Sequence, residues 1–225
     1  MIRLVCLVIG YVFGLFPTAV LYGKAHGIDI TKEGSGNPGT TNSLRVLGKR
    51  AAVVVLLGDA FKTFFAMLLC AYAFKKMCPD MGMLLKMYAG IGATLGHNFP
   101  FYNGFKGGKG IAATGGMCLS VGWRTTLACI IVFFSIFFTT HYVSICSLLM
   151  VSTFWASIVV QGQLGLFGMS QAHLIELYIV SLFVPVMAFI RHIENLKRLF
   201  KGRERKTYIL KKNKDTNETA SEPEK

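Results

Sequence analysis

Long apolar runs separated by short polar segments dominate this sequence. A helix needs about 20 predominantly apolar residues to cross a hydrocarbon core that is roughly 30 Å thick. Several runs approach or meet that length, so the pattern predicts an all-α polytopic membrane protein. The predicted spans are Leu4–Leu21, Ala51–Phe74, Met83–Phe101, Thr125–Thr139, Val143–Val160 and Leu174–Ile190.

A further apolar segment, Gly110–Val121, is too short for a complete crossing, because its helix would extend only about 18 Å. Counting it as a short or partial span gives seven transmembrane helices. The two most basic segments, Gly23–Arg50 and the chain after Ile190, then lie on one side, which the positive-inside rule assigns to the cytoplasm. The loop Gln161–His173 contains no Lys or Arg, so we expect it outside together with the N-terminus.

Composition supports lipid as the solvent, since 53% of residues are hydrophobic and only 16% are charged. The formal net charge of +13 does not indicate nucleic-acid binding, because the basic residues gather at helix ends and in the tail. The six cysteines show no paired spacing and most lie in or beside apolar runs. We therefore predict no disulfide, no metal site and no cofactor.

The chain divides into a membrane-embedded domain, residues 1–203, and a basic cytoplasmic tail, residues 204–225. From about Lys206 the tail is rich in Lys, Asn, Thr, Glu and Ser. Such a segment buries too little apolar surface to offset its conformational entropy, so it is expected to be disordered.

The first polar segment that interrupts the apolar pattern is Gly34–Arg45, GSGNPGTTNSLR. Its glycines permit positive φ angles, with which successive amide N–H groups turn toward one anion. Arg45 adds a planar guanidinium that suits phosphate or carboxylate. The segment is not a Walker loop, because no Gly-Lys-Ser/Thr follows at the required spacing. A glycine turn with an ordinary cytoplasmic arginine is the alternative interpretation.

The second polar segment is Gly96–Thr114, GHNFPFYNGFKGGKGIAAT. Lys106 and Lys109 flank two glycines, so both ammonium groups are expected to converge on one anionic ligand. A loop that touches lipid headgroups is the alternative. His97 is either a ligand contact or a buried core histidine, and on its own the second interpretation is favoured.

The third polar segment is Arg191–Gly202, RHIENLKRLFKG, directly after the last predicted span. His192 and Asn195 are three positions apart, so on a helix they share a face and address the same site. For the other basic residues the favoured interpretation is that of snorkelling membrane anchors; these are Arg191, Lys197 and Arg198.

Shorter signals lie inside the predicted spans. Asp59 and Lys62 are intramembrane charges, which are functional candidates by default and are otherwise an internal ion pair. Ser144 and Ser147 follow Tyr142 at the start of another span.

In this order, GSGNPGTTNSLR, GHNFPFYNGFKGGKG and HIENLKRL resemble the acyl-phosphate-dependent glycerol-3-phosphate acyltransferase family of bacterial inner membranes. The resemblance extends from the first span to Gly202. It implies a seven-helix fold with its active site at the cytoplasmic face. It also implies transfer of an acyl group from acyl phosphate to the 1-hydroxyl of glycerol 3-phosphate, giving lysophosphatidic acid and phosphate in the first step of phospholipid synthesis.

The resemblance assigns roles to individual residues. The implied catalytic residues are Ser35, Arg45, Lys109, Ser147, His192 and Asn195. The implied substrate-binding residues are Gly36, Asn37, Gly39, Thr41, Asn42, His97, Lys106, Gly107, Gly108 and Gly110. The chain departs from the family at Thr40, Thr63 and Ile193, where an alanine, a glycine and a basic residue are common. Ile193 removes a basic contact without changing its neighbour His192.

Expected partners are glycerol 3-phosphate, acyl phosphate, membrane lipid and a soluble enzyme that produces acyl phosphate; nucleic acid is not expected. The proton acceptor is either His192 or the phosphate of the donor. A rival enzyme class uses acyl thioesters and a His-x4-Asp pair, but no histidine here is followed by aspartate at that spacing. A transporter for a phosphorylated solute is also disfavoured, because the sequence shows no inverted repeat and its polar segments gather at one surface.

Overall fold

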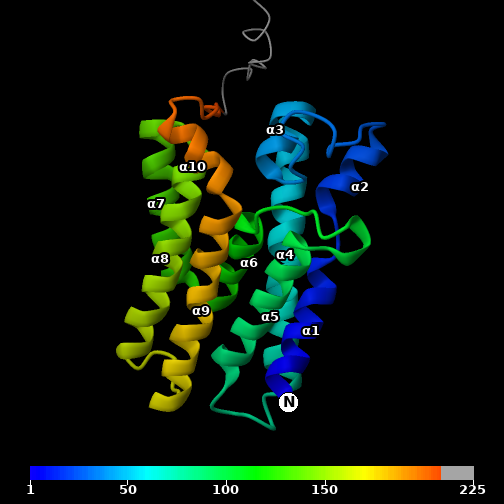
Figure 1. The fold of residues 1–225 in the computed structure, drawn as a ribbon. Coiled ribbons are helices and arrows are strands. Elements are labelled where there is room, and N and C mark those ends of the chain that lie inside the picture. Colours follow the sequence, from blue (N-terminus) through cyan, green and yellow to red (C-terminus); the bar gives the residue numbers. More distant parts are fainter. Residues whose placement is uncertain (209–225) are drawn as a thin grey trace, which may run out of the picture.

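The computed structural model describes residues 1–208, and within them all regular secondary structure is helical (Figure 1). The α-helices are α1 (Ile2–Gly14), α2 (Thr18–Ala25), α3 (Thr40–Leu47), α4 (Lys49–Ala73), α5 (Gly82–Asn98), α6 (Ile111–Val121), α7 (Trp123–Thr140), α8 (Val143–Gln163), α9 (Gln171–Arg191) and α10 (Ile193–Phe200). One 3-10 turn, η1 (Phe101–Asn103), follows α5.

Five segments within the described chain are long and apolar enough to cross a membrane, and α6 is a shorter apolar helix. Helix α4 has apolar side chains on its outer surface and charged side chains inside, the reverse of a helix in a water-soluble protein. It exposes Leu57, Phe61 and Phe65 while it buries Asp59 and Lys62. The prediction of an all-helical membrane protein is confirmed. The five segments are Ile2–Ala25, Lys49–Ala73, Trp123–Thr140, Val143–Gln163 and Gln171–Arg191.

The first predicted span, Leu4–Leu21, is not one continuous helix. Helix α1 ends at Gly14 and α2 begins at Thr18. Pro17 causes the break, because proline has no N–H to donate and disfavours helical backbone at the residue before it, Phe16. The break takes the Phe16 carbonyl out of the helical ladder, and the Lys62 ammonium donates to it at 2.7 Å.

Glycines let α1 and α5 pack with their backbones in contact. A Cβ atom added to Gly14 would lie 2.1 Å from the carbonyl oxygen of Ala93. A Cβ atom added to Gly10, Gly92 or Gly96 would likewise clash with a carbonyl oxygen of the facing helix. Each helix therefore presents two glycines four residues apart to the other helix. Small residues at this spacing allow close association in lipid, where the hydrophobic effect does not drive helices together.

The helices form two groups with α6 between them (Figure 1). Helices α1, α4 and α5 pack together on one side, and α7, α8 and α9 on the other. The N-terminus lies at one end of the bundle, whereas α2, α3 and α10 lie at the other end. The chain between η1 and α6 crosses from the first group toward α6. All three polar segments singled out in the sequence are thus brought toward the same end.

The glycine contact between α1 and α5 can be tested by substitution. Gly14→Val is expected to lower the Tm of the detergent-solubilised protein by about 5–10 °C, since overpacking costs roughly 1–3 kcal/mol. Gly115→Ala is the control, because a Cβ there meets no atom within 4 Å. Thermal unfolding followed by circular dichroism gives both values. An unchanged Tm for Gly14→Val would contradict the proposed contact.

Candidate active site

The first polar segment forms a loop that is organised by Asn42. This side chain is only 2% exposed, and its Oδ1 accepts from the Ser35 N–H at 2.8 Å. Its Nδ2 donates to two loop carbonyls, at 3.0 and 3.2 Å. Gly34 has a φ of +59°, and a Cβ on it would lie 2.4 Å from Asn42 Oδ1. The amide of Asn42 therefore shapes the loop and leaves the exposed Ser35 at its surface.

Helix α3 begins at Thr40, directly after Gly39, and carries Arg45 in its last turn. Arg45 Nη2 donates to Thr207 Oγ1 at 2.8 Å. Thr207 is 2% exposed, and its N–H donates to the carbonyl of His141. The segment after α10 therefore contacts Arg45, the arginine of the first polar segment.

The glycines of the second polar segment pack against His97. The Gly108 N–H donates to the His97 carbonyl at 3.1 Å, and a Cβ on Gly107 would lie 2.1 Å from the same oxygen. A Cβ on Gly108 would lie 2.0 Å from His97 Nε2. Gly110 has a φ of +78° and is the N-cap residue of α6. Only residues without a Cβ permit this approach of the loop to the histidine.

Arg191, at the end of α9, holds the glycine pair from the other side. Its guanidinium donates to the Gly108 carbonyl at 2.8 and 3.2 Å and to the Gly107 carbonyl at 2.9 Å. It also lies over the ring of Phe99, 5.2 Å from the ring centre. A snorkelling side chain would keep its charge in water, so the role of Arg191 as a simple membrane anchor is wrong.

Lys109 leads into a chain of polar contacts that ends at a carboxylate. Its ammonium donates to Asn195 Oδ1, and Asn195 Nδ2 donates to Glu204 Oε1 at 2.6 Å. The second oxygen of Glu204 accepts from Arg198 Nε at 2.9 Å. The amide of Asn195 therefore orients Lys109, and Glu204 in turn orients Asn195.

Burial lowers the pKa of Lys109 to about 8. This value already includes a smaller lowering by the positive charges of Arg198, Arg191 and Arg45 and an opposing effect of Glu204, which raises the pKa. The three polar segments are therefore close enough to interact electrostatically at one lysine. This concentration of positive charge favours binding of an anion, because an anion offsets the repulsion between the lysine and the arginines.

His192, between α9 and α10, is 3% exposed. Its Nδ1 lies 2.7 Å from the Ala188 carbonyl, which can only accept, so Nδ1 carries the hydrogen and Nε2 has the lone pair. Burial, followed by the charge of Lys109, lowers the pKa of His192 to about 4. The imidazole is therefore neutral at pH 7, with an acceptor nitrogen at Nε2.

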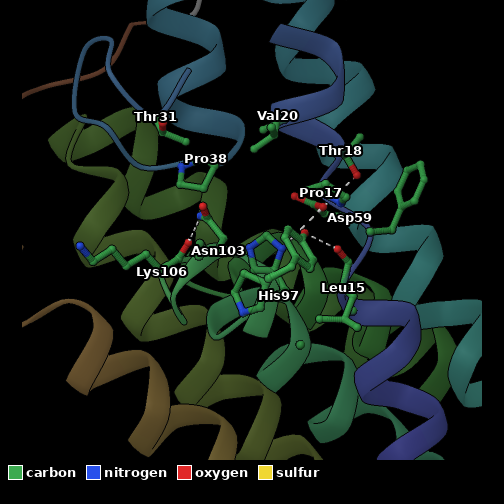
Figure 2. Close-up of a pocket in the computed structure, with 18 of the residues that line it drawn as sticks. Leu15, Pro17, Thr18, Val20, Thr31, Pro38, Asp59, His97, Asn103 and Lys106 are labelled. Carbon is green, nitrogen blue, oxygen red and sulfur yellow. Dashed lines mark hydrogen bonds and ion pairs between the residues drawn. The ribbon is translucent and has the colours of Figure 1, made fainter. Parts of the chain in front are cut away.

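A cavity of about 300 Å³ is lined in part by the glycine pair Gly107 and Gly108. Figure 2 shows several of its other lining residues. Lys106, His97 and Thr31 line it together with the backbone around Pro17. Lys109 does not belong to this lining and instead contacts Asn195. Lys106 thus lines the cavity while Lys109 contacts Asn195, whereas the sequence predicted that the two lysines converge.

The serine on α8, Ser147, is 1% exposed and donates to the carbonyl of Val143 in its own helix at 2.7 Å. Within residues 1–208 its hydroxyl makes no hydrogen bond to another predicted site residue. The remaining predicted residues of the first loop, Gly36, Asn37, Gly39 and Thr41, are half-buried around Asn42.

Sequence reasoning missed Glu204 and Thr207, which it placed in a disordered tail. An acidic residue amid basic ones at 197–206 was the available signal for Glu204. Glu204 and Thr207 contact the site, whereas 209–225 lie outside the described residues, so the predicted tail boundary stays a prediction.

A family model described as glycerol-3-phosphate acyltransferase matches residues 4–202. The chain belongs to this family. A glycerol-3-phosphate acyltransferase from Alkaliphilus metalliredigens is 38% identical over 92% of this chain and 96% of its own length. One from Clostridioides difficile is 37% identical over 88% of this chain and 92% of its own length.

The same family relationship extends to solved structures. A crystal structure of PlsY, an integral membrane glycerol 3-phosphate acyltransferase, in its glycerol 3-phosphate form matches with a TM-score of 0.79 and 28% identity. The match covers 92% of this chain and 96% of that one. The lysophosphatidic acid form of PlsY matches with a TM-score of 0.78. The resemblance stated from the three sequence segments is confirmed, as is an integral membrane fold.

The clamp formed by Arg191 generates a structural prediction. Arg191→Met keeps the apolar stem but removes the hydrogen bonds to Gly107 and Gly108, so the glycine loop is expected to open more readily. Hydrogen exchange of a peptide that contains residues 104–110, measured by mass spectrometry, is expected to become at least about tenfold faster, since a bond to a charged group contributes about 1.5–3 kcal/mol. Arg3→Met is the control, because Arg3 pairs with Glu176 elsewhere. Equal exchange in all three proteins would contradict the clamp.

Proposed function

We propose that this chain transfers an acyl group from acyl phosphate to the 1-hydroxyl of glycerol 3-phosphate, giving lysophosphatidic acid and inorganic phosphate. The supporting observation is Lys109, which is half-buried and lies close enough to Arg45, Arg191 and Arg198 to feel their charges. Within a family of glycerol-3-phosphate acyltransferases, this concentration of cations fits reactants that both carry phosphate. An acyl phosphate supplies the second phosphate, whereas a simple thioester would not.

The reaction needs no covalent enzyme intermediate, because phosphate is already a good leaving group. The C1 oxygen of glycerol 3-phosphate attacks the acyl carbonyl carbon and forms a new C–O bond. The bond between that carbon and the phosphate oxygen then breaks, and phosphate leaves with the bonding electrons. The hydroxyl proton passes to the phosphate that departs, so atoms and charge balance.

Lys109 and Arg45 bind the anionic oxygens and stabilise the charge that develops on the acyl oxygen and the leaving phosphate. The first amides of α3 and α6, which have no acceptor within their own helices, add uncharged donors. Asn195 keeps the Lys109 ammonium in place. Ser35 lies at the loop surface, where its hydroxyl can contact the same phosphate.

His192 positions the hydroxyl rather than acting as the base. Its Nε2 is an acceptor, so it can receive the hydrogen bond of the C1 hydroxyl. With a pKa of about 4, however, it is a weaker base than a phosphate group, whose second pKa is near 6. The donor phosphate is therefore the better proton acceptor of the two.

The arrangement of the helices supports seven crossings, with α6 as a partial one and the site at the cytoplasmic face. The site elements α2, α3 and α10 share the end of the bundle opposite the N-terminus (Figure 1). Basic residues at that end include Lys24, Lys32, Arg45, Lys49, Arg50, Lys106, Lys109, Lys197, Arg198 and Lys201. The positive-inside rule then places the N-terminus outside and the site in the cytoplasm of a bacterial cell, where a soluble enzyme would supply the acyl phosphate.

The donor and the site can be tested together. Purified protein offered palmitoyl phosphate, palmitoyl-CoA and palmitoyl-acyl carrier protein in parallel is expected to form lysophosphatidic acid only from the phosphate. Arg45→Ala and Lys109→Ala are each expected to lower kcat/KM by at least about 100-fold, the usual effect of losing one donor to developing charge. Lys197→Ala is the control, because Lys197 makes an exposed pair with Glu194.

Two results would count against these assignments. Full activity in both Arg45→Ala and Lys109→Ala would remove the proposed site, and efficient transfer from a thioester would replace the proposed donor. Circular dichroism and size-exclusion chromatography of each variant separate loss of function from loss of fold.

The pKa of Lys109 predicts the pH dependence. Because this pKa is lowered to about 8, the ammonium is present below pH 8 and is lost as the pH rises above it. The value of kcat/KM, which reports on the free enzyme, is expected to fall above pH 8. Lys109→Arg should move this fall to higher pH in whatever activity remains. His192 should add no inflection between pH 5 and 7, so one that disappears in His192→Ala would make His192 the base.

A further inference from the structure

A buried polar cluster lies where the break between α1 and α2 meets α4, α5 and the glycine loop. It consists of the Phe16 carbonyl, Thr18, Asp59, Lys62 and His97. Asp59, Thr18 and His97 lie together at the wall of the cavity (Figure 2). The chemistry proposed for Lys109 and His192 does not use this cluster.

Every hydrogen of the Lys62 ammonium has an acceptor. Its Nζ lies 2.7 Å from the Phe16 carbonyl oxygen, 2.8 Å from Asp59 Oδ1 and 3.1 Å from His97 Nδ1. An ammonium group has three N–H donors and no acceptor. The nitrogen of His97 that faces Lys62 is therefore an acceptor.

This contact fixes the tautomer of His97. A neutral imidazole carries one hydrogen, so with Nδ1 as the acceptor the hydrogen is on Nε2. The nearest carboxylate oxygen, Asp59 Oδ1, lies 3.7 Å from Nδ1, too far for a hydrogen bond. That oxygen already accepts from Lys62 and from Thr18, at 2.8 and 3.0 Å. No acceptor therefore draws the hydrogen to Nδ1.

The Nε2–H of His97 faces the glycine pair. A Cβ on Gly108 would lie 2.0 Å from Nε2, and both residues line the cavity together with Lys106. Within residues 1–208 the Nε2 atom makes no hydrogen bond. An oxygen of a phosphorylated molecule held over the glycines would meet this N–H directly.

We propose that Asp59 and Lys62 are positioning residues that hold His97 with its hydrogen on Nε2, where it donates to a phosphate oxygen of glycerol 3-phosphate. This inference rests on the proposed function, since it assumes that the glycine loop receives that substrate. Asp59 places the Lys62 ammonium, and Lys62 sets the donor and acceptor sides of His97. The intramembrane ion pair thereby acts on substrate binding through a neutral histidine.

The tautomer can be measured without any turnover. In protein labelled with ¹⁵N-histidine and kept in detergent, the ¹⁵N shifts distinguish a protonated from an unprotonated ring nitrogen. The His97 signals are those missing from His97→Asn. We expect one neutral form, with hydrogen on Nε2 only. A hydrogen on Nδ1 in the unaltered protein, or a comparable mixture of both forms, would overturn the proposal.

Substitutions test the part played by the ion pair. The double variant with Asp59→Asn and Lys62→Met removes both charges, so neither is left buried alone. We expect it to show a mixture of His97 tautomers and a KM for glycerol 3-phosphate about tenfold higher, as for one lost hydrogen bond to a charged group, with kcat changed less. Lys86→Met is the matched control, because Lys86 is a half-buried helical lysine that donates to the Ser120 carbonyl.

The outcomes separate this inference from the proposed function. If the double variant folds with the His97 tautomer and the KM unchanged, the positioning role is wrong while the acyltransferase activity stands. If the double variant does not fold, the spectrum of the unaltered protein still decides the tautomer. If the unaltered protein shows the Nε2–H form but does not acylate glycerol 3-phosphate, the proposed function fails, and with it the substrate assigned to this donor.

Discussion

Crowding of positive charge is the constraint on which the site depends. Lys109 is half-buried beside arginines from two distant parts of the chain, Arg45 in α3 and the pair Arg191 and Arg198 in α9 and α10, and the charge of Glu204 also acts on it. Burial and like charge both disfavour the ammonium and lower the pKa of Lys109 to about 8. A phosphate anion would offset the repulsion between these cations. This charge arrangement is the physical basis of the proposed preference for phosphorylated substrates.

Packing between helices has to hold these charges together. The glycines shared by α1 and α5 bring the backbones into contact, and the end of α5 then places His97 beneath the glycine loop. Arg191 fixes the other side of that loop through its carbonyl oxygens. The helix contact and the clamp thus both act on the glycine loop that precedes Lys109. In lipid, where apolar burial contributes little to helix association, such close contacts and buried hydrogen bonds position the site.

The polar groups buried within the membrane-spanning helices also pair with one another in a way that positions the site. Pro17 breaks the first span and takes the Phe16 carbonyl out of the helical ladder, a group that costs several kcal/mol if it is left unpaired in lipid. Lys62 meets this carbonyl, and Asp59 balances the charge of Lys62. A break that looks like a defect thus gives Lys62 a fixed position beside His97. The three N–H groups of the Lys62 ammonium therefore have two roles. They pair the Phe16 carbonyl and the Asp59 carboxylate, and they orient His97.

The sequence by itself determined the helical membrane class, the three polar segments and the family, because apolar length and the order of glycines, cations and His192 are properties of local sequence. It also indicated Arg45, Lys109, His192 and Asn195 as site candidates. Only the tertiary structure decided that Arg191 clamps the glycine loop, that Glu204 and Thr207 reach the site and that Lys106 lines the cavity while Lys109 contacts Asn195. These features depend on which atoms meet across helices far apart in the chain, and no local pattern records such distances.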